Sequence, residues 1–249
     1  MAARKKKNTM LTKLIFMTLL AMTSIIAMAQ DVTQFMGIPV DGTPEEMLRK
    51  LRAKGFKPTE YDAEMLEGEF NGYDVNVGVV TNKGKVWRVG VLDKKGVSEG
   101  DIKIRFNKLI RQFSKNDKYI VIDAEPIAED EDISYEMTVH NKRYQATFAQ
   151  VPDFEQLASL DSAEVLRTPI ISFLLETARL ADMTLGELLN MEGGTPFELI
   201  AKQGRGGEFI DILRQKSVWF MISKGVNFGK YEICLYYDNE LNTAHGEDL

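Results

Sequence analysis

The stretch YDVNVGVVTNKGKVWRVGVLD (residues 73–93) decides the fold class. From 73 to 79, a tyrosine and three valines alternate with small or polar residues, the period-two pattern of a strand with one buried face. Asn82-Lys83-Gly84 supplies the turn of a hairpin into a second alternating strand. The preceding segment MLEGEFNG (65–72) predicts a third strand. The chain therefore contains an antiparallel meander.

Helix-starting patterns precede this meander and recur after it. Thr43, followed by Pro44 and by Glu46 three residues on, matches a capping box with proline at the first helical position. Ser98 and Asp101 have the same spacing, and apolar residues follow Ser98 at helical intervals. The order of helix and then strands thus begins twice, at Thr43 and at Ser98.

The second series of elements is expected to be interrupted. A hairpin is predicted from 133–140 and 143–150, followed by helices from 152 to about 215 and by strands at 218–224 and 230–238. The sequence thus predicts an α+β fold of two helix-plus-antiparallel-strand units, the second split by a helical insertion whose flanking strands pair across it. The expected organisation is a signal peptide (1–29), a first helix-plus-meander unit (30–97), the start of a second unit (98–151), a helical insertion (152–216), closing strands (217–240) and a polar tail (241–249).

The N-terminus has the pattern of a secretory signal peptide. Arg4, Lys5–Lys7 and Lys13 precede an apolar run from 14 to 29 that ends in Ala27-Met28-Ala29. The run is shorter than the ~20 residues that span a bilayer, which argues against a membrane anchor. We expect cleavage near Ala29, a periplasmic or secreted protein, and no integral membrane span after cleavage.

Charge and cysteine content limit the partners. Without the five basic residues of the signal, 26 Lys+Arg would face 37 acids, a formal charge of −11. Nucleic acids and anionic membranes attract basic surfaces, so this balance argues against both. The single cysteine, Cys234, excludes an internal disulfide and is expected to pack as a small apolar group.

No motif marks a catalytic centre. His140, His245 and Cys234 lack the paired spacing of a zinc site. GVNFGKY (225–231) departs from a phosphate-binding loop, and the acids 129–132 lack the glycine of a calcium loop. We predict no catalytic residue, metal or cofactor. A carboxylate pair that no motif marks stays open, since the chain has 37 acids.

Aromatic residues in the predicted strands are the best candidates for a binding site. Tyr236 falls on the same face as Glu232 and Asp238, away from the apolar alternation, and Trp219 lies in the neighbouring strand. Exposed aromatics on a sheet can anchor a partner, although cross-strand packing is the simpler interpretation. Trp87 is expected in the core, on the face of Val89.

Three stretches, GIPVDGTPEEMLRKLRAKGF, GYDVNVGVVTNKGKVWRV and YEICLYYDNELNTAHGEDL, together resemble a family of secreted, uncharacterised proteins of gut-type anaerobic bacteria. This resemblance covers most of the mature chain and implies no activity. More distantly, a helix that starts at Gly-Thr and leads into three antiparallel strands resembles the fold of beta-lactamase inhibitor protein and of small outer-membrane assembly lipoproteins. These are protein-binding modules. The chain departs from them in having one helix before the first strands, no lipid-bearing cysteine and an intervening helical segment. No functional residue is transferred from either group.

The expected function is a non-catalytic, exported module that binds another protein of the cell envelope or extracellular space, with Trp219 and Tyr236 as candidate contacts. The alternative is a secreted hydrolase with carboxylate catalysis. Converging, desolvated carboxylates would favour the hydrolase, and an aromatic sheet face would favour binding.

Overall fold

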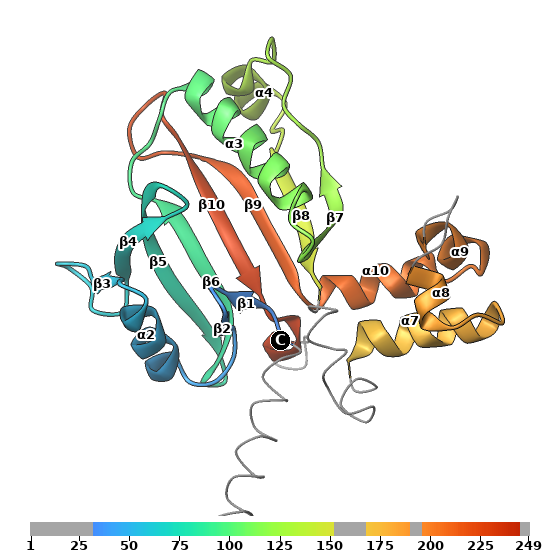
Figure 1. Ribbon diagram of the computed structural model, residues 1–249. Helices are drawn as coiled ribbons and strands as arrows, with labels where there is room; N and C mark the ends of the chain where they lie inside the picture. The colour runs from blue at the N-terminus through green and yellow to red at the C-terminus, as the bar shows by residue number, and fades with distance from the viewer. Residues whose placement is uncertain (1–31, 152–167, 190–195, 245–249) are drawn as a thin grey trace, which may run out of the picture. The chain divides into compact units, whose positions relative to one another are not determined.

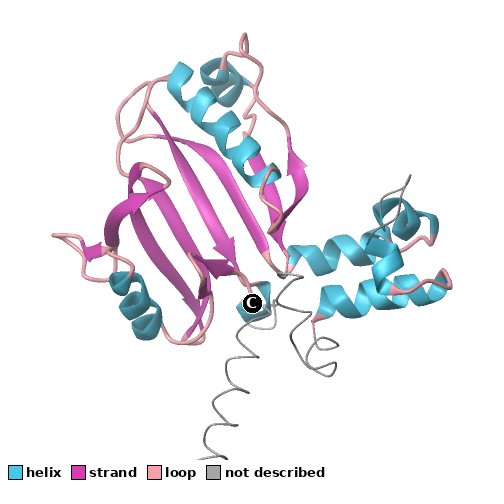
Figure 2. Ribbon diagram, viewed as in Figure 1, coloured by secondary structure: helices cyan, strands magenta, loops and turns pink. Residues whose placement is uncertain are grey.

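A computed structural model describes residues 32–151, 168–189 and 196–244, all within one compact unit, Val32–Leu249. Eight antiparallel strands form a sheet in the order β3-β4-β5-β6-β10-β9-β8-β7 (Figures 1 and 2). Their bounds are β3 Lys57–Pro58, β4 Leu66–Phe70, β5 Tyr73–Asn82, β6 Lys85–Asp93, β7 Tyr119–Ala124, β8 Gln145–Gln150, β9 Ser217–Lys224 and β10 Tyr231–Asp238. With its helices, the protein has the α+β fold that the sequence predicts.

Helices α2 (Pro44–Ala53) and α3 (Glu99–Ser114) lie over the same face of this sheet (Figure 1). Both begin where the capping patterns predict, because the Thr43 and Ser98 hydroxyls accept hydrogen bonds from the backbone amides of Glu46 and Asp101, each at 3.3 Å. The Glu46 carboxylate, however, binds Lys50 Nζ at 2.8 Å along the helix. The helix caps are therefore local features that the sequence alone specifies.

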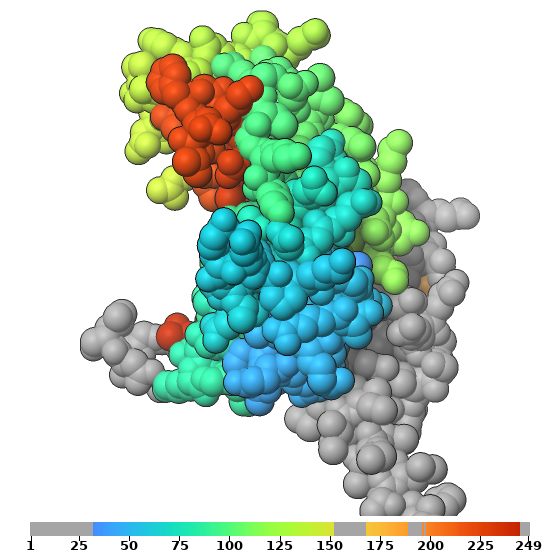
Figure 3. Space-filling model, turned by 90° about the vertical axis from the view of Figure 1, so that its left-hand side faces the viewer, coloured from blue at the N-terminus to red at the C-terminus, as the bar shows by residue number. Residues whose placement is uncertain are grey.

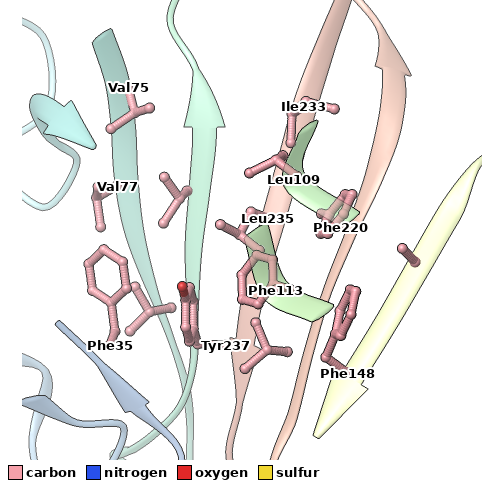
Figure 4. Packing of buried hydrophobic residues seen from close by; sticks show 14 of the residues in the cluster. Phe35, Val75, Val77, Leu109, Phe113, Phe148, Phe220, Ile233, Leu235 and Tyr237 are labelled. Atoms are coloured by element: carbon pink, nitrogen blue, oxygen red, sulfur yellow. The ribbon is translucent and has the colours of Figure 1, made fainter. Parts of the chain in front are cut away.

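The main core lies between these two helices and the sheet. Figure 4 shows alternate strand residues pointing to this side, among them Val75 and Val77 of β5 and Ile233, Leu235 and Tyr237 of β10. The Phe113 ring of α3 stacks 5.0 Å from the Phe148 ring and 5.8 Å from the Phe220 ring, centroid to centroid. The face of the sheet that carries α2 and α3 is thus predominantly apolar.

The closing strands β10 and β9 lie in the middle of the sheet, between β6 and β8. β6 pairs with β10 through Leu235 opposite Val91, and β9 pairs with β8 through Phe220 opposite Ala146. The closing strands therefore do pair across the helical segment, as expected.

The segment 133–140 was predicted as a hairpin strand, and this prediction is wrong. It forms α4 (Ile133–Val139), capped by Asp132, whose Oδ1 accepts the Tyr135 amide hydrogen bond at 2.8 Å. The partner of β8 is instead β7, which the sequence analysis did not predict. His140, which the sequence analysis placed on that strand, is instead the residue after the last turn of α4. Its Nδ1 lies 2.9 Å from Glu136 Oε2. Apolar alternation in this segment favoured a strand in the prediction, but the protein forms a helix that begins at the Asp132 cap.

The helical segment between β8 and β9 has its own core. It contains α7 (Pro169–Leu180), α8 (Leu185–Leu189), α9 (Pro196–Lys202) and α10 (Gly206–Arg214). Thr184 and Glu187 form a capping box before α8, with the Thr184 amide 2.7 Å from the Glu187 carboxylate. Buried side chains of α7 and α10 pack together with Ala149 and Val151 at the end of β8. Among the helices described, none combines the length and apolar character that crossing a bilayer requires.

The ends of the described chain are tied to the sheet. Two short strands, β1 (Gln34–Phe35) and β2 (Ile38–Pro39), pair with each other near the core, and a short helix, η2 (Glu240–Asn242), follows β10. The Asn239 side chain donates to the Val40 carbonyl oxygen at 2.8 Å. The predicted signal peptide (1–29) and the end of the polar tail (245–249) lie outside the described residues.

Candidate binding face

The face of the sheet opposite α2 and α3, here called the open face, carries the two aromatic residues selected from the sequence. Strand register places one row across it: Gly78, Gly90, Tyr236, Trp219 and Thr147 pair in succession from β5 to β8. A side chain at Gly90 would lie 3.4 Å from the Tyr236 ring, so this ring extends across the glycine. The absence of a side chain at Gly90 leaves the Tyr236 ring room on the sheet surface, whereas Met65 lies over Gly78.

Tyr236 and Trp219 are in direct contact. Their ring centroids are 4.4 Å apart with 32° between the ring planes, and both residues are partly exposed. Burial raises the pKa of the Tyr236 hydroxyl, so it stays neutral at physiological pH. Cross-strand packing and exposure therefore occur together, and the two interpretations offered by the sequence do not exclude each other.

A β-bulge brings a third aromatic residue to this face. The register between β5 and β6 shifts so that Val80 pairs with Arg88 and Thr81 with Val86, which leaves Trp87 without a partner. Trp87 was expected in the core, but it is only partly buried, and the Arg88 guanidinium lies 4.3 Å from its ring centroid. The expectation is wrong because the bulge, which strict alternation ignores, turns Trp87 away from the face of Val89.

The centre of the open face is an ion pair surrounded by rings. Arg88 Nε and Nη2 donate to Asp238 Oδ1 and Oδ2, each at 2.6 Å, and Trp219 Nε1 donates to Oδ2 at 2.8 Å. The Asp238 side chain is only 2% exposed, whereas that of Arg88 is 23% exposed. Arg88 Cζ also lies 4.9 Å from the Tyr236 ring centroid and 5.3 Å from that of Trp219. We call these five residues (Trp87, Arg88, Trp219, Tyr236, Asp238) the aromatic cluster.

Sequence reasoning found two members of the aromatic cluster and missed three. Tyr236 and Trp219 stood out because strand alternation assigned Tyr236 to a polar face. Arg88 and Asp238 gave no signal, since they lie 150 positions apart and meet only through the pairing of β6 with β10. The binding role of Tyr236 and Trp219 stays a prediction.

The other buried carboxylate lies on the opposite face. Asp93 of β6 pairs with Arg105 of α3 and accepts the Ile233 amide at 3.0 Å. Burial raises the pKa of Asp93, while the Arg105 guanidinium and the Ile233 amide act to lower it. Asp93 and Asp238 are thus separated by the sheet, and each is bound to an arginine. They do not form the converging pair that hydrolysis needs.

The Cys234 thiol and possible metal-binding clusters are the remaining candidates for chemistry. Cys234 is buried on the open face, and burial raises the pKa of its thiol, which disfavours the reactive thiolate. Within the residues that the structure describes, no group of three or more His, Cys, Asp or Glu side chains is placed to hold a metal ion.

Comparisons with family models, curated proteins and solved structures found no match to this chain.

Proposed function

We propose that this is an exported, non-catalytic module that binds another protein through the aromatic cluster on its open face. The observation that carries the proposal is the partly exposed pair of Trp219 and Tyr236, whose rings are in contact and whose Trp219 N–H is bound by the buried Asp238 carboxylate. Tryptophan, tyrosine and arginine are the residues most enriched at the energetic centres of protein interfaces. Here all three types are gathered at one place and are ordered before any partner arrives, which lowers the entropy lost on binding.

The hydrogen bonding of the cluster favours a protein surface over a glycan. The charged groups and the Trp219 N–H bond to one another, so the cluster presents mainly ring faces outward. Neighbouring open-face residues include the apolar Met221, Leu92 and exposed Val80, and beside Trp219 the polar Thr147. A sugar would require free polar groups beside the rings, whereas an apolar protein patch would not.

The proposal is tested by photocrosslinking from the open face. The chain beginning at Gln30 would carry p-benzoylphenylalanine in place of Met221 and be mixed with envelope extract and culture fluid of the producing cells. The control carries the same group in place of Ile104, which is 67% exposed on α3, on the other face. We expect one protein to be crosslinked from position 221 and not from position 104.

Variants of the aromatic cluster then test whether binding of the crosslinked protein requires it. Tyr236→Ser should weaken binding of the identified protein about 30-fold, the effect of a hot-spot residue, and Tyr236→Phe should retain binding because it keeps the ring. Tyr61→Ser serves as control, since Tyr61 is 93% exposed in the loop between β3 and β4. Far-UV circular dichroism would check that each variant folds. Equal loss in both serine variants, crosslinking only to a second copy of this chain, or no crosslink together with hydrolysis of a peptide or glycan panel would refute the proposal.

A further inference from the structure

The loop that joins β9 to β10, Gly225-Val226-Asn227-Phe228-Gly229-Lys230, is here called the tip loop. Val226 is 99% exposed and Phe228 is 106% exposed, more than any other large apolar residues that the structure describes. In the space-filling view, this part of the chain (orange-red) lies at the surface beside the yellow-green of α4 and the green of α3 (Figure 3). Each such side chain leaves about 1.5–3 kcal/mol of burial energy unrealised in the free protein.

The tip loop is a hydrogen-bonded turn that fixes the position of Phe228. The Gly225 amide donates to the Lys230 carbonyl oxygen at 2.8 Å, and the Lys230 amide donates to that of Asn227 at 3.1 Å. Gly229 has φ +68°, the value that the third position of such a turn requires of glycine. Phe228 therefore occupies the second position of a β-turn, where its side chain points away from the hairpin's own strands.

The base of the tip loop is braced by the segment after β6. Val97 and Tyr231 exchange backbone hydrogen bonds of 2.9 and 3.0 Å. The Glu232 carboxylate lies against Gly225 and Gly96, where an added Cβ would come within 2.9 and 3.3 Å of its Oε1. A braced base limits the motion of the loop, so Phe228 can enter a partner with little loss of entropy.

The charge next to the tip loop differs from that of the protein as a whole. Lys224 precedes the tip loop and Lys230 is its last residue, and among the residues described neither forms an ion pair. Lys224 Nζ donates to the Thr138 hydroxyl at 3.1 Å. In the neighbouring segment, Lys94 forms an ion pair with Glu67, and Lys95 forms one with Asp74. Two lysines without ion-pair partners thus border the apolar tip, while the Glu232 carboxylate lies at its base; the formal charge of the whole chain is −6. This arrangement is complementary to an apolar pocket with an acidic rim.

We propose that Phe228 and Val226 insert into an apolar pocket with an acidic rim on the partner protein. The inference rests on the proposed function in assuming a protein partner, but it uses different residues from the aromatic cluster. A lipid surface is the weaker alternative, since two apolar side chains are a small anchor and the acids of the chain repel anionic headgroups.

The experiment uses the chain beginning at Gln30 with p-benzoylphenylalanine in place of Val226. We expect it to crosslink the same protein as the open-face position. With that protein purified, Phe228→Ser should weaken binding at least about 30-fold, while Tyr61→Ser should not. Lys230→Glu should slow association at low salt and much less at high salt, because the partner's rim is acidic.

Failure of this inference can be told apart from failure of the proposed function. A crosslink from position 221 without one from position 226, or unchanged affinity of Phe228→Ser, overturns the insertion and leaves the open face standing. Absence of crosslinks from both positions overturns both. Sedimentation of the wild-type chain with phosphatidylglycerol vesicles that Phe228→Ser abolishes, without a protein crosslink from 226, would assign the tip loop to a membrane instead.

Discussion

The ion pair between Arg88 and Asp238 offers the sharpest test of the structure. In Arg88→Met, the Asp238 carboxylate keeps the Trp219 N–H as side-chain donor while its side chain is only 2% exposed. Removing one partner of a buried pair costs about 3–5 kcal/mol, and we expect about 3–4 here. In Asp238→Leu, the remaining guanidinium was already 23% exposed and can turn to water, so we expect a smaller loss of about 2–3 kcal/mol.

The double variant Arg88→Met/Asp238→Leu should lose less free energy of unfolding than the two single variants lose together. It removes both charges, so no unpaired ion is left in the cluster, and Met still contacts the rings. We expect a total loss of about 2 kcal/mol, which corresponds to a coupling energy of about 3–5 kcal/mol. The exposed pair of Glu46 and Lys50, whose side chains are 47% and 38% exposed, is the control and should couple by less than about 0.5 kcal/mol.

Urea unfolding followed by tryptophan fluorescence is the appropriate assay. The chain has two tryptophans, Trp87 and Trp219, and both belong to the aromatic cluster, so the signal reports on the place that is changed. Far-UV circular dichroism should give the same midpoints if unfolding has two states. Additivity of the two single variants to within about 0.5 kcal/mol would show that Arg88 and Asp238 do not interact as the structure has it.

Three further predictions concern single residues. The Cys234 thiol, buried and with a raised pKa, should react with iodoacetamide at pH 8 at least about tenfold more slowly in the folded protein than in urea; equal rates would contradict its burial. Gly68→Ala should lower the free energy of unfolding by about 1–3 kcal/mol in urea titrations, because the new Cβ would lie 2.6 Å from the Phe56 ring; a neutral effect would mean that the ring moves freely. Arg105→Met should cost about 3–5 kcal/mol at pH 7 by leaving the Asp93 carboxylate unpaired. Since burial raises the folded-state pKa of Asp93, this loss should be smallest below the unfolded value of about 4 and grow as pH rises through the folded one; a loss independent of pH would refute the assignment.

Local rules predicted most helices and strands. The caps at Thr43 and Ser98 and the alternation in β5 and β6 are encoded within a few residues, and the structure agrees with them. Prediction failed at α4, where alternation and a helix cap at Asp132 competed in one short segment. In such a segment, the choice between helix and strand depends on tertiary packing more than on propensity.

The candidate site could be predicted only in part. Alternation along β10 sufficed to turn Tyr236 away from the core, because the period of a strand is a local property. The bulge that exposes Trp87 arises from the register between β5 and β6, which neither strand specifies alone. Exposure of Phe228 was likewise not evident, since a loop phenylalanine can equally fold back onto its own hairpin.

The sequence by itself determined the α+β class, the starts of the helices and the strands of the meander, because capping and alternation act over a few residues. Only the tertiary structure decided that β6 and β10 pair, and with this pairing that Arg88 meets Asp238 between three aromatic rings. The physical reason is that a contact between residues 150 positions apart depends on strand order and register, which the packing of the whole sheet selects.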